Sequence, residues 1–91
     1  MVKDYRSKAK IYADILESIY SQGYARPTRI MTDANLSHDR LVKYLDILIE
    51  KGLIKKSGES ENVFTITEKG VNYLHEFRRF EKFAAVFGLR L

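Results

Sequence analysis

Hydrophobic side chains recur with a helical period in the first quarter of the chain. Three isoleucines stand four residues apart, at Ile11, Ile15 and Ile19. This spacing places them on one face of a helix and predicts a helix over residues 4–22. Gly23 is a typical C-terminal stop for that helix. Residues 24–27 are predicted to be extended, because the residue before a proline avoids the helical region.

A short helix and a longer one follow, separated by a compact break at residues 35–37. Thr28 is suited to cap the short helix, which the pattern predicts over residues 29–35. Its inward side chains are expected to be Ile30, Met31 and Ala34. Ser37 is suited to cap the longer helix, predicted over residues 38–51. The side chains expected to be buried there are Leu41, Leu48, Ile49 and either Tyr44 or Leu45.

The pattern then changes from helical to extended. Residues 53–56 and 63–67 are predicted to be two strands, joined by the polar, turn-forming residues 57–62. Thr67 is suited to cap a fourth helix that runs from residue 68 to residue 87 or further. The pattern thus predicts a mainly helical α+β chain with one two-stranded hairpin.

A helix pair joined by a tight turn and followed at once by a hairpin is typical of winged helix-turn-helix domains. The third helix would then lie in the major groove of DNA, and the hairpin would be the wing. Some three-helix domains that bind no DNA share much of this order of elements. Winged domains also serve as protein-interaction modules, so the order of elements leaves the partner open.

The outward positions near the start of the third predicted helix are candidates for DNA contact. Arg40 and Lys43 have the chemistry to contact guanine or phosphate, and Val42 can meet a thymine methyl group. The other candidates there are Ser37, at the helix start where a phosphate can bind, and His38. A plain solvated helix face is the alternative. Asp39 favours that alternative, because a carboxylate repels phosphate unless it accepts a hydrogen bond from cytosine.

Other cations are placed to hold the DNA backbone. The candidates before and within the second helix are Arg26, Thr28 and Arg29, and those at the wing base are Lys55 and Lys56. Contacts of this kind fix the register of a protein on DNA without reading its sequence. The wing tip carries Glu59 and Glu61, so we expect it to stay away from the DNA.

The string Pro-Thr-Arg-Ile-Met-Thr-Asp-Ala-Asn-Leu-Ser at residues 27–37 resembles a group of archaeal winged-helix proteins. Residues 43–45, 50–54 and 66–70 extend the resemblance, which covers roughly residues 11–80. The group includes the ten-kilodalton archaeal chromatin proteins and related predicted transcriptional regulators. The resemblance implies a homodimer with two DNA-binding heads, joined by an antiparallel coiled coil of long C-terminal helices.

The fourth predicted helix carries an apolar seam with heptad spacing. Its members are Tyr73, Phe77, Phe80, Ala84, Phe87 and Leu91. We expect residues 1–68 to form the DNA-binding head and residues 69–91 to form the dimerisation helix. The coil should be short, because the chain ends soon after Phe87. The alternative is that the seam covers the core of its own chain, although Phe80, Phe83 and Phe87 extend beyond a typical wing-domain core.

The amino-acid composition narrows the classes of protein to which the chain can belong. The 91 residues are expected to form one unit, and a net charge of +4 is compatible with a polyanionic partner. With no cysteine, the chain has neither disulfides nor thiolate metal sites. His38 and His75 lack a second ligand at suitable spacing, so no metal or other cofactor is expected. No signal peptide and no membrane-spanning run is evident, which predicts a cytoplasmic, nucleoid-associated protein.

The sequence therefore predicts a dimeric protein whose partners are double-stranded DNA and a second copy of itself. A transcriptional regulator is the first expectation. An architectural protein with little sequence preference and a winged domain for protein interaction are the alternatives. An enzyme is not expected, because the sequence has no glycine-rich phosphate loop and no nucleophile paired with a base. No small-molecule ligand is evident.

Overall fold

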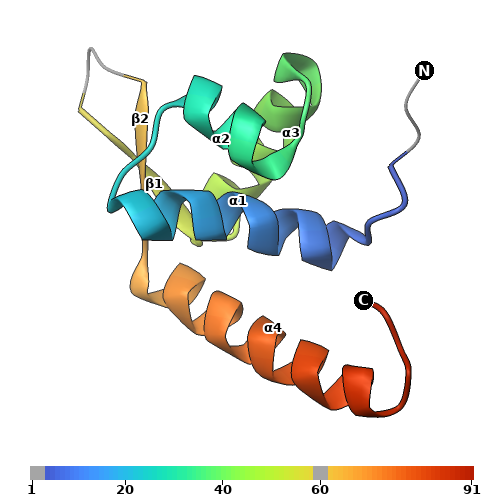
Figure 1. Cartoon of the computed structure of the whole chain (residues 1–91). Coiled ribbons are helices and arrows are strands. Elements are labelled where there is room, and N and C mark those ends of the chain that lie inside the picture. The colour runs from blue at the N-terminus through green and yellow to red at the C-terminus, as the bar shows by residue number, and fades with distance from the viewer. Residues whose placement is uncertain (1–3, 59–61) are drawn as a thin grey trace.

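The computed structural model describes residues 4–58 and 62–91 (Figure 1). Its elements are, in order, α1 (Lys8–Gln22), α2 (Pro27–Ala34), α3 (His38–Glu50), β1 (Ile54–Ser57), β2 (Val63–Ile66) and α4 (Glu68–Val86). The predicted order of elements and the mainly helical class are therefore confirmed. The expectation for the wing tip, at Glu59 and Glu61, lies outside the described residues.

Helix α1 lies in the middle of the fold. It packs against α2 on one side and against α4 on the other, so α4 lies across the molecule from the α2–α3 pair (Figure 1). The hairpin of β1 and β2 stands at the end of the molecule that holds the start of α2 (Figure 1). This arrangement separates the predicted DNA-binding elements from the predicted dimerisation helix.

Two predicted helix starts are wrong. Helix α1 begins at Lys8 instead of residue 4, because the Ser7 hydroxyl caps it by accepting a hydrogen bond from the Lys10 N–H at 3.1 Å. Helix α2 begins at Pro27, so Thr28 lies inside its first turn and does not cap it. Proline suits the first helical position, since its φ is already helical and its missing N–H would have had no partner there.

The break between α2 and α3 has the predicted geometry. Asn35 adopts the left-handed conformation, with φ 53° and ψ 59°, and ends α2. The Leu36 N–H then donates to the Met31 carbonyl at 3.0 Å, and the Leu36 side chain is buried. The Ser37 hydroxyl caps α3 by accepting from the Arg40 N–H. The turn is thus closed by local bonds and anchored by one apolar side chain.

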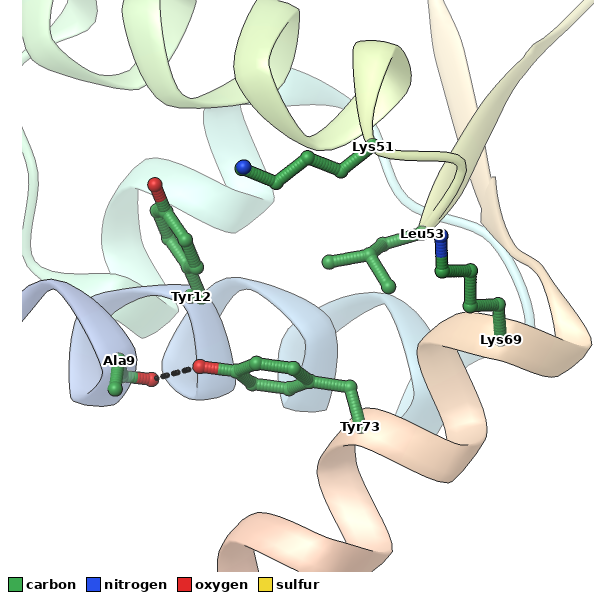
Figure 2. A pocket seen from close by; sticks show the side chains of 6 residues that line it. All are labelled: Ala9, Tyr12, Lys51, Leu53, Lys69 and Tyr73. Carbon is green, nitrogen blue, oxygen red and sulfur yellow. Dashed lines mark hydrogen bonds between the residues drawn. The ribbon is translucent and has the colours of Figure 1, made fainter.

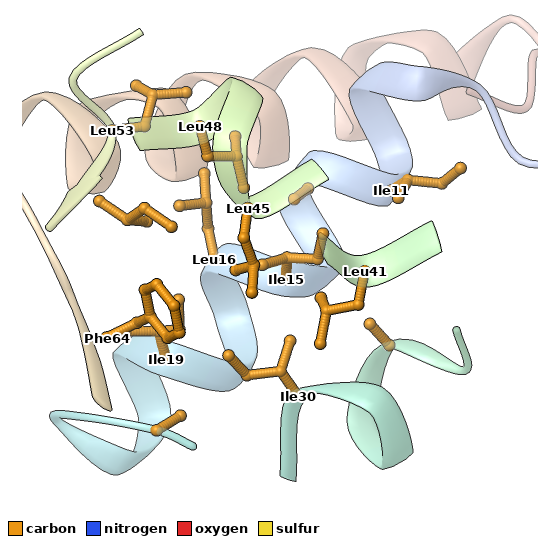
Figure 3. Close-up of a cluster of buried hydrophobic side chains, with 14 of the residues drawn as sticks. Ile11, Ile15, Leu16, Ile19, Ile30, Leu41, Leu45, Leu48, Leu53 and Phe64 are labelled. Atoms are coloured by element: carbon orange, nitrogen blue, oxygen red, sulfur yellow. The ribbon is translucent and has the colours of Figure 1, made fainter. Parts of the chain in front are cut away.

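The core lies where α1 meets α2, α3 and the sheet (Figure 3). Its most deeply buried large side chains are Ile15, Leu16, Ile19, Ile30, Leu41, Leu48, Ile54 and Leu74. Leu45 is buried, whereas Tyr44 is only partly buried. The prediction that Ile49 is buried is wrong, since it is 40% exposed. Ile49 follows Leu48 by about 100° around the helix, which carries it to the solvent side of the buried stripe.

The wing is a two-stranded antiparallel sheet in which Ile54 pairs with Ile66 and Lys56 with Phe64. The predicted extended segment after α1 adds a short bridge to it. Ala25 and Phe64 exchange two backbone hydrogen bonds, each 2.9 Å long. Residue 25 therefore anchors β2, which lies between β1 and residue 25, to the segment that leads into α2, a contact that sequence patterns did not predict.

Helix α4 leaves the wing through a close packing point. The Thr67 hydroxyl accepts from the Gly70 N–H at 3.1 Å, as predicted for a cap, and also donates to the Gly52 carbonyl at 2.6 Å. A Cβ atom on Gly70 would lie 2.2 Å from the Leu53 carbonyl oxygen. The first turn of α4 can approach the end of α3 this closely only because residue 70 has no side chain.

We expect Gly70→Ala to destabilise the protein by about 1–3 kcal/mol, the usual range for an overpacked site. Helix propensity alone would give the opposite sign, a gain of roughly 0.5–1 kcal/mol. Urea unfolding measures the difference. Asn72→Ala, at an exposed position of the same helix, is the control and should be neutral or slightly stabilising. A Gly70→Ala variant as stable as the wild type would show that the close approach is not needed.

Candidate nucleic-acid interface

The first half of α3 presents a mixed polar and apolar face to solvent. Ser37, His38, Asp39, Val42 and Lys43 are all exposed. Within residues 4–58 and 62–91, no ion pair involves Lys43, so its ammonium group is available to a partner. The Asp39 side chain is fully exposed, and its carboxylate lies 3.9 Å from the His38 ring. The face therefore carries one uncommitted cation, one acid and one apolar contact point.

Arg40, the other predicted base-contacting cation, is held by its own chain. Its guanidinium lies 3.0 Å from the Asp4 carboxylate and 6.0 Å from the centre of the Tyr44 ring. Hydrogen bonding to Tyr44 and then to Asp4 raises the pKa of Arg40. The side chain stays 40% exposed, so part of the guanidinium still faces solvent.

Arg29, on α2, is also paired. Its Nε donates to the Asp33 carboxylate at 3.0 Å, one helical turn further along. The buried Ser18 hydroxyl donates to the same oxygen, and these two hydrogen bonds, Ser18 first, lower the pKa of Asp33. Arg26 and Thr28 are exposed at the start of α2. Arg29 thus keeps an exposed guanidinium, but part of its charge is balanced by Asp33.

The two wing-base lysines point in opposite directions. Lys55 pairs with Thr65 and Lys56 with Phe64 in the sheet register, and both lysines are exposed. Successive residues of a strand project from opposite faces. Only one of the two lysines can therefore lie on the same side of the molecule as the exposed face of α3, although the sequence predicts both as contacts to the DNA backbone.

The predicted seam of α4 divides between the interior and the surface. Phe77 and Ala84 are buried within their own chain, at 8% and 1% exposure, and Tyr73 and Leu91 are partly buried against the core. Phe77 and Ala84 are therefore covered within the chain, and their place in an interface between copies stays a prediction. Phe80 and Phe87 remain exposed. The packing of α4 on α1 uses part of the heptad stripe and leaves the rest to solvent.

The exposed apolar surface of α4 continues beside the predicted seam. Its members, named here the α4 apolar patch, are Phe80, Phe83, Val86, Phe87 and Leu89, each at least 57% exposed. The rings of Phe83 and Phe87 lie 5.1 Å apart. The sequence predicts that Phe83 extends beyond the core, whereas Val86 and Leu89 do not belong to the heptad seam and are not predicted to be exposed. Helix α4 ends at Val86; beyond it Gly88 has a φ of +73°, and the Leu89 N–H donates to the Ala84 carbonyl.

Comparison with known proteins adds the family. A family model described as winged helix-turn-helix matches residues 5–85, which is most of the chain. The chain belongs to the winged helix-turn-helix family. The resemblance found in the sequence is therefore confirmed, and the α2–α3 pair is the helix-turn-helix unit of this family with β1 and β2 as its wing.

Individual relatives agree with the winged helix-turn-helix assignment. Sso10a-2, described as a DNA-binding protein from Sulfolobus solfataricus, matches with a TM-score of 0.80 and 26% identity over 90% of this chain and 85% of its own. MarR from E. coli shares the fold, with a TM-score of 0.64 and 20% identity over 71% of this chain and 48% of its own. The "Uncharacterized protein MJ0287" of Methanocaldococcus jannaschii is 42% identical over 65 residues. That match covers 71% of this chain and 63% of the relative.

Aromatic contacts fix the direction of α4 against the winged helix-turn-helix head (Figure 2). The Tyr12 ring lies 5.9 Å from the Tyr44 ring and 6.3 Å from the Tyr73 ring, so it bridges α3 and α4. The Tyr73 hydroxyl donates to the Ala9 carbonyl at 2.8 Å. Burial, and secondarily Tyr12, raise the pKa of Tyr73. A groove beside the first turns of α4 is lined by Ala9, Tyr12, Lys51, Leu53, Lys69 and Tyr73 (Figure 2).

The described residues hold neither a candidate metal site nor a helix that could span a membrane. Residues 4–58 and 62–91 contain no group of three acidic or histidine side chains able to hold a metal ion. No helix among them is long and apolar enough to cross a bilayer. Family and fold are those of winged helix-turn-helix proteins, and the similar structure Sso10a-2 is a DNA-binding protein.

Proposed function

We propose that this chain is a homodimeric transcriptional regulator that binds double-stranded DNA. The observation that carries the proposal is the exposed first half of α3. It starts at a capped N-terminus, displays the uncommitted Lys43, and follows α2, whose N-cap and first turn carry exposed cations of their own. A helix start of this kind favours phosphate, because its first N–H groups have no partner within the helix. The likeness to Sso10a-2, a DNA-binding protein, supports the same partner.

Each candidate residue has a distinct role in this proposal. Backbone phosphates are bound by Arg26, Thr28, Arg29 and Ser37 and by the lysine of the pair Lys55 and Lys56 that faces the DNA. The base edges in the major groove are contacted by His38, Arg40, Val42 and Lys43. Phosphate contacts supply most of the affinity, and base contacts supply the preference for a sequence.

The second copy is proposed to cover the α4 apolar patch. A domain of this size buries a modest share of its surface, so several exposed aromatic rings on one helix are costly unless a partner covers them. The patch lies across α1 from the α2–α3 pair (Figure 1). Two copies joined through α4 would therefore keep both DNA-binding faces free.

Salt-dependent binding to duplex DNA tests the proposal. The logarithm of the binding constant should fall linearly with the logarithm of salt concentration, with a slope of about −0.9 per phosphate neutralised. Fluorescence anisotropy with a labelled duplex measures both affinity and slope. Failure to bind any duplex at low salt would contradict the proposed partner.

Two substitutions separate phosphate contacts from base contacts. Arg29→Ala should weaken binding to all sequences by a similar factor and make the salt slope shallower by about one unit. Arg40→Ala should lower the affinity for a preferred site more than that for random duplex. Arg79→Ala, on α4 and 78% exposed at its side chain, removes the same charge away from the α3 face and is the control. Equal effects of Arg29→Ala and Arg79→Ala would argue against a specific DNA-binding face.

An architectural protein with little sequence preference is the second candidate, and one observation favours it. The α3 face carries the fully exposed carboxylate of Asp39 beside a small number of cations, so strong base contacts are few. The ratio of affinities for a site selected from a random pool and for random duplex distinguishes the two functions. A ratio of about 10³ or more supports a regulator, and a ratio near unity supports the architectural role.

A further inference from the structure

The residues before α1 form a clamp on the helix-turn-helix unit. The Arg6 guanidinium donates to the carbonyls of Ala34 at 2.6 Å and Asn35 at 3.1 Å. These are among the last carbonyls of α2, which the helix itself leaves without partners. Arg6 also donates to the Asp14 carboxylate of α1 at 2.9 Å. Arg6 is therefore held by α1 and by the turn before α3 at the same time.

This clamp places one carboxylate beside the first turn of α3. Asp4 accepts three hydrogen bonds from Arg6, from the backbone N–H and from two guanidinium nitrogens, at 2.8 to 3.0 Å. The side chain is only 14% exposed, and one of its oxygens also lies 3.0 Å from the Arg40 guanidinium. Hydrogen bonding to Arg6 is the main cause that holds the pKa of Asp4 well below its usual range. The acid that faces Arg40 is thus fixed in place.

Arg40 is consequently held on two sides, by Asp4 at one edge of its guanidinium and by the Tyr44 ring 6.0 Å away. A guanidinium has five N–H donors in a planar fork, and the Asp4 carboxylate lies 3.0 Å from one of its nitrogens, Nη1. The donors that neither Asp4 nor Tyr44 engages are available to a base edge. A side chain already fixed in its bound orientation loses less freedom on binding. The carboxylate also repels phosphate, which disfavours contacts that read no sequence.

We propose that Asp4 is a specificity-determining residue, which positions Arg40 for contact with a base and disfavours contact between Arg40 and a phosphate. The inference rests on the proposed DNA-binding function and adds a residue outside the helix-turn-helix unit to it. Nothing in the sequence pattern singles out Asp4, because it is one acid among four basic residues in the first eleven positions. Only the folded chain brings it to residue 40.

The test compares two affinities for each variant, one for a duplex selected by the wild type from a random pool and one for random duplex. In Asp4→Asn the ratio of the two should fall by about tenfold, which lies within the discrimination of one bidentate Arg–guanine contact. Affinity for random duplex should stay the same or rise. Asp4→Glu keeps the charge but moves the carboxylate by one methylene, so it should also lower the ratio. Thermal unfolding establishes that both variants are folded.

Two controls separate positioning from net charge. Glu17→Gln removes the same charge from α1, and Glu17 pairs with Arg78 of α4, away from the clamp formed by Arg6 and Asp4. It should change both affinities by one factor and leave their ratio unaltered. In an Arg40→Ala background, Asp4→Asn should have no effect on the ratio, because the residue on which it acts is gone.

Several results would overturn the role of Asp4 alone. They are an unchanged ratio in Asp4→Asn, a reduced ratio that persists in the Arg40→Ala background, and a wild type that binds DNA without sequence preference. A wild type that binds no duplex at all would instead remove the proposed function on which the inference rests.

Discussion

Replacing Phe80 or Phe83 with aspartate is expected to convert a dimer into a monomer and to weaken binding to a two-site duplex by about 10²-fold or more. Both rings are more than half exposed in the single chain, at 57% and 61%. A charge introduced into an apolar interface loses its hydration without gaining a partner. Coupling two DNA-binding heads increases the overall affinity by about 10²–10⁴-fold, and this gain is lost when the heads separate.

Light scattering on the purified protein measures the oligomeric state, and anisotropy with the same duplex measures the affinity. Asn72→Asp introduces the same charge at an exposed position near the start of α4 and should leave both unchanged. Binding of one variant head to a single-site duplex should be nearly unaffected, because α4 lies away from the α3 face (Figure 1). A wild type that is monomeric at micromolar concentration would show that the α4 apolar patch has another role.

Leu16→Ala should destabilise the protein by about 2–5 kcal/mol, the range for a large buried aliphatic side chain. Leu16 is fully buried and lies on α1, which packs against both the α2–α3 side and α4 (Figure 3). Proteins of this length are stable by roughly 5–14 kcal/mol. The substitution therefore removes a large fraction of the total stability, and it acts on the helix against which α2 and α4 pack.

Urea unfolding of wild type and variant at one protein concentration measures the change, since the stability of a dimer depends on concentration. Ile49→Ala is the control, because Ile49 is an aliphatic residue of α3 that is 40% exposed. It should cost less than about 1 kcal/mol. Equal losses in the two variants would mean that α3 is rotated relative to the structure described here.

Most of the fold was predictable because its signals are local. The Ser37 and Thr67 caps and the left-handed Asn35 follow from side-chain chemistry within a few residues of each helix end. Local signals also misled in two places. Pro27 and Thr28 are both suited to the start of a helix, and α2 begins at Pro27. Residue 4 continues the helical pattern of α1, yet its side chain is bound to Arg6 and Arg40.

The candidate site was predictable only as a set of residues on elements. The sequence places Arg29, Arg40 and Lys43 on the two helices of the helix-turn-helix unit, and the structure keeps them there. Arg29 and Asp33 stand four residues apart on α2, a spacing at which helical side chains are neighbours, so their ion pair could have been found in the sequence. The sequence does not indicate that Arg40 pairs with Asp4, because that contact depends on the three-dimensional position of an acid far away in the chain.

The seam on α4 illustrates the same division. A heptad stripe establishes that one side of the helix is apolar, because helical geometry alone puts residues three and four apart on one face. It does not establish what covers that side. Phe77 and Ala84 are buried within the chain, and Phe80 and Phe87 remain exposed.

The sequence by itself determined the order of elements, the helix starts capped by Ser37 and Thr67, and the winged helix-turn-helix family. These properties depend on contacts between residues near one another along the chain. Only the tertiary structure decided that α1 starts at the Ser7 cap, which part of α4 faces outward, and that Asp4 lies beside Arg40. Those properties depend on contacts between distant residues, such as the Arg6 clamp on Ala34 and Asn35, which form only when the elements pack.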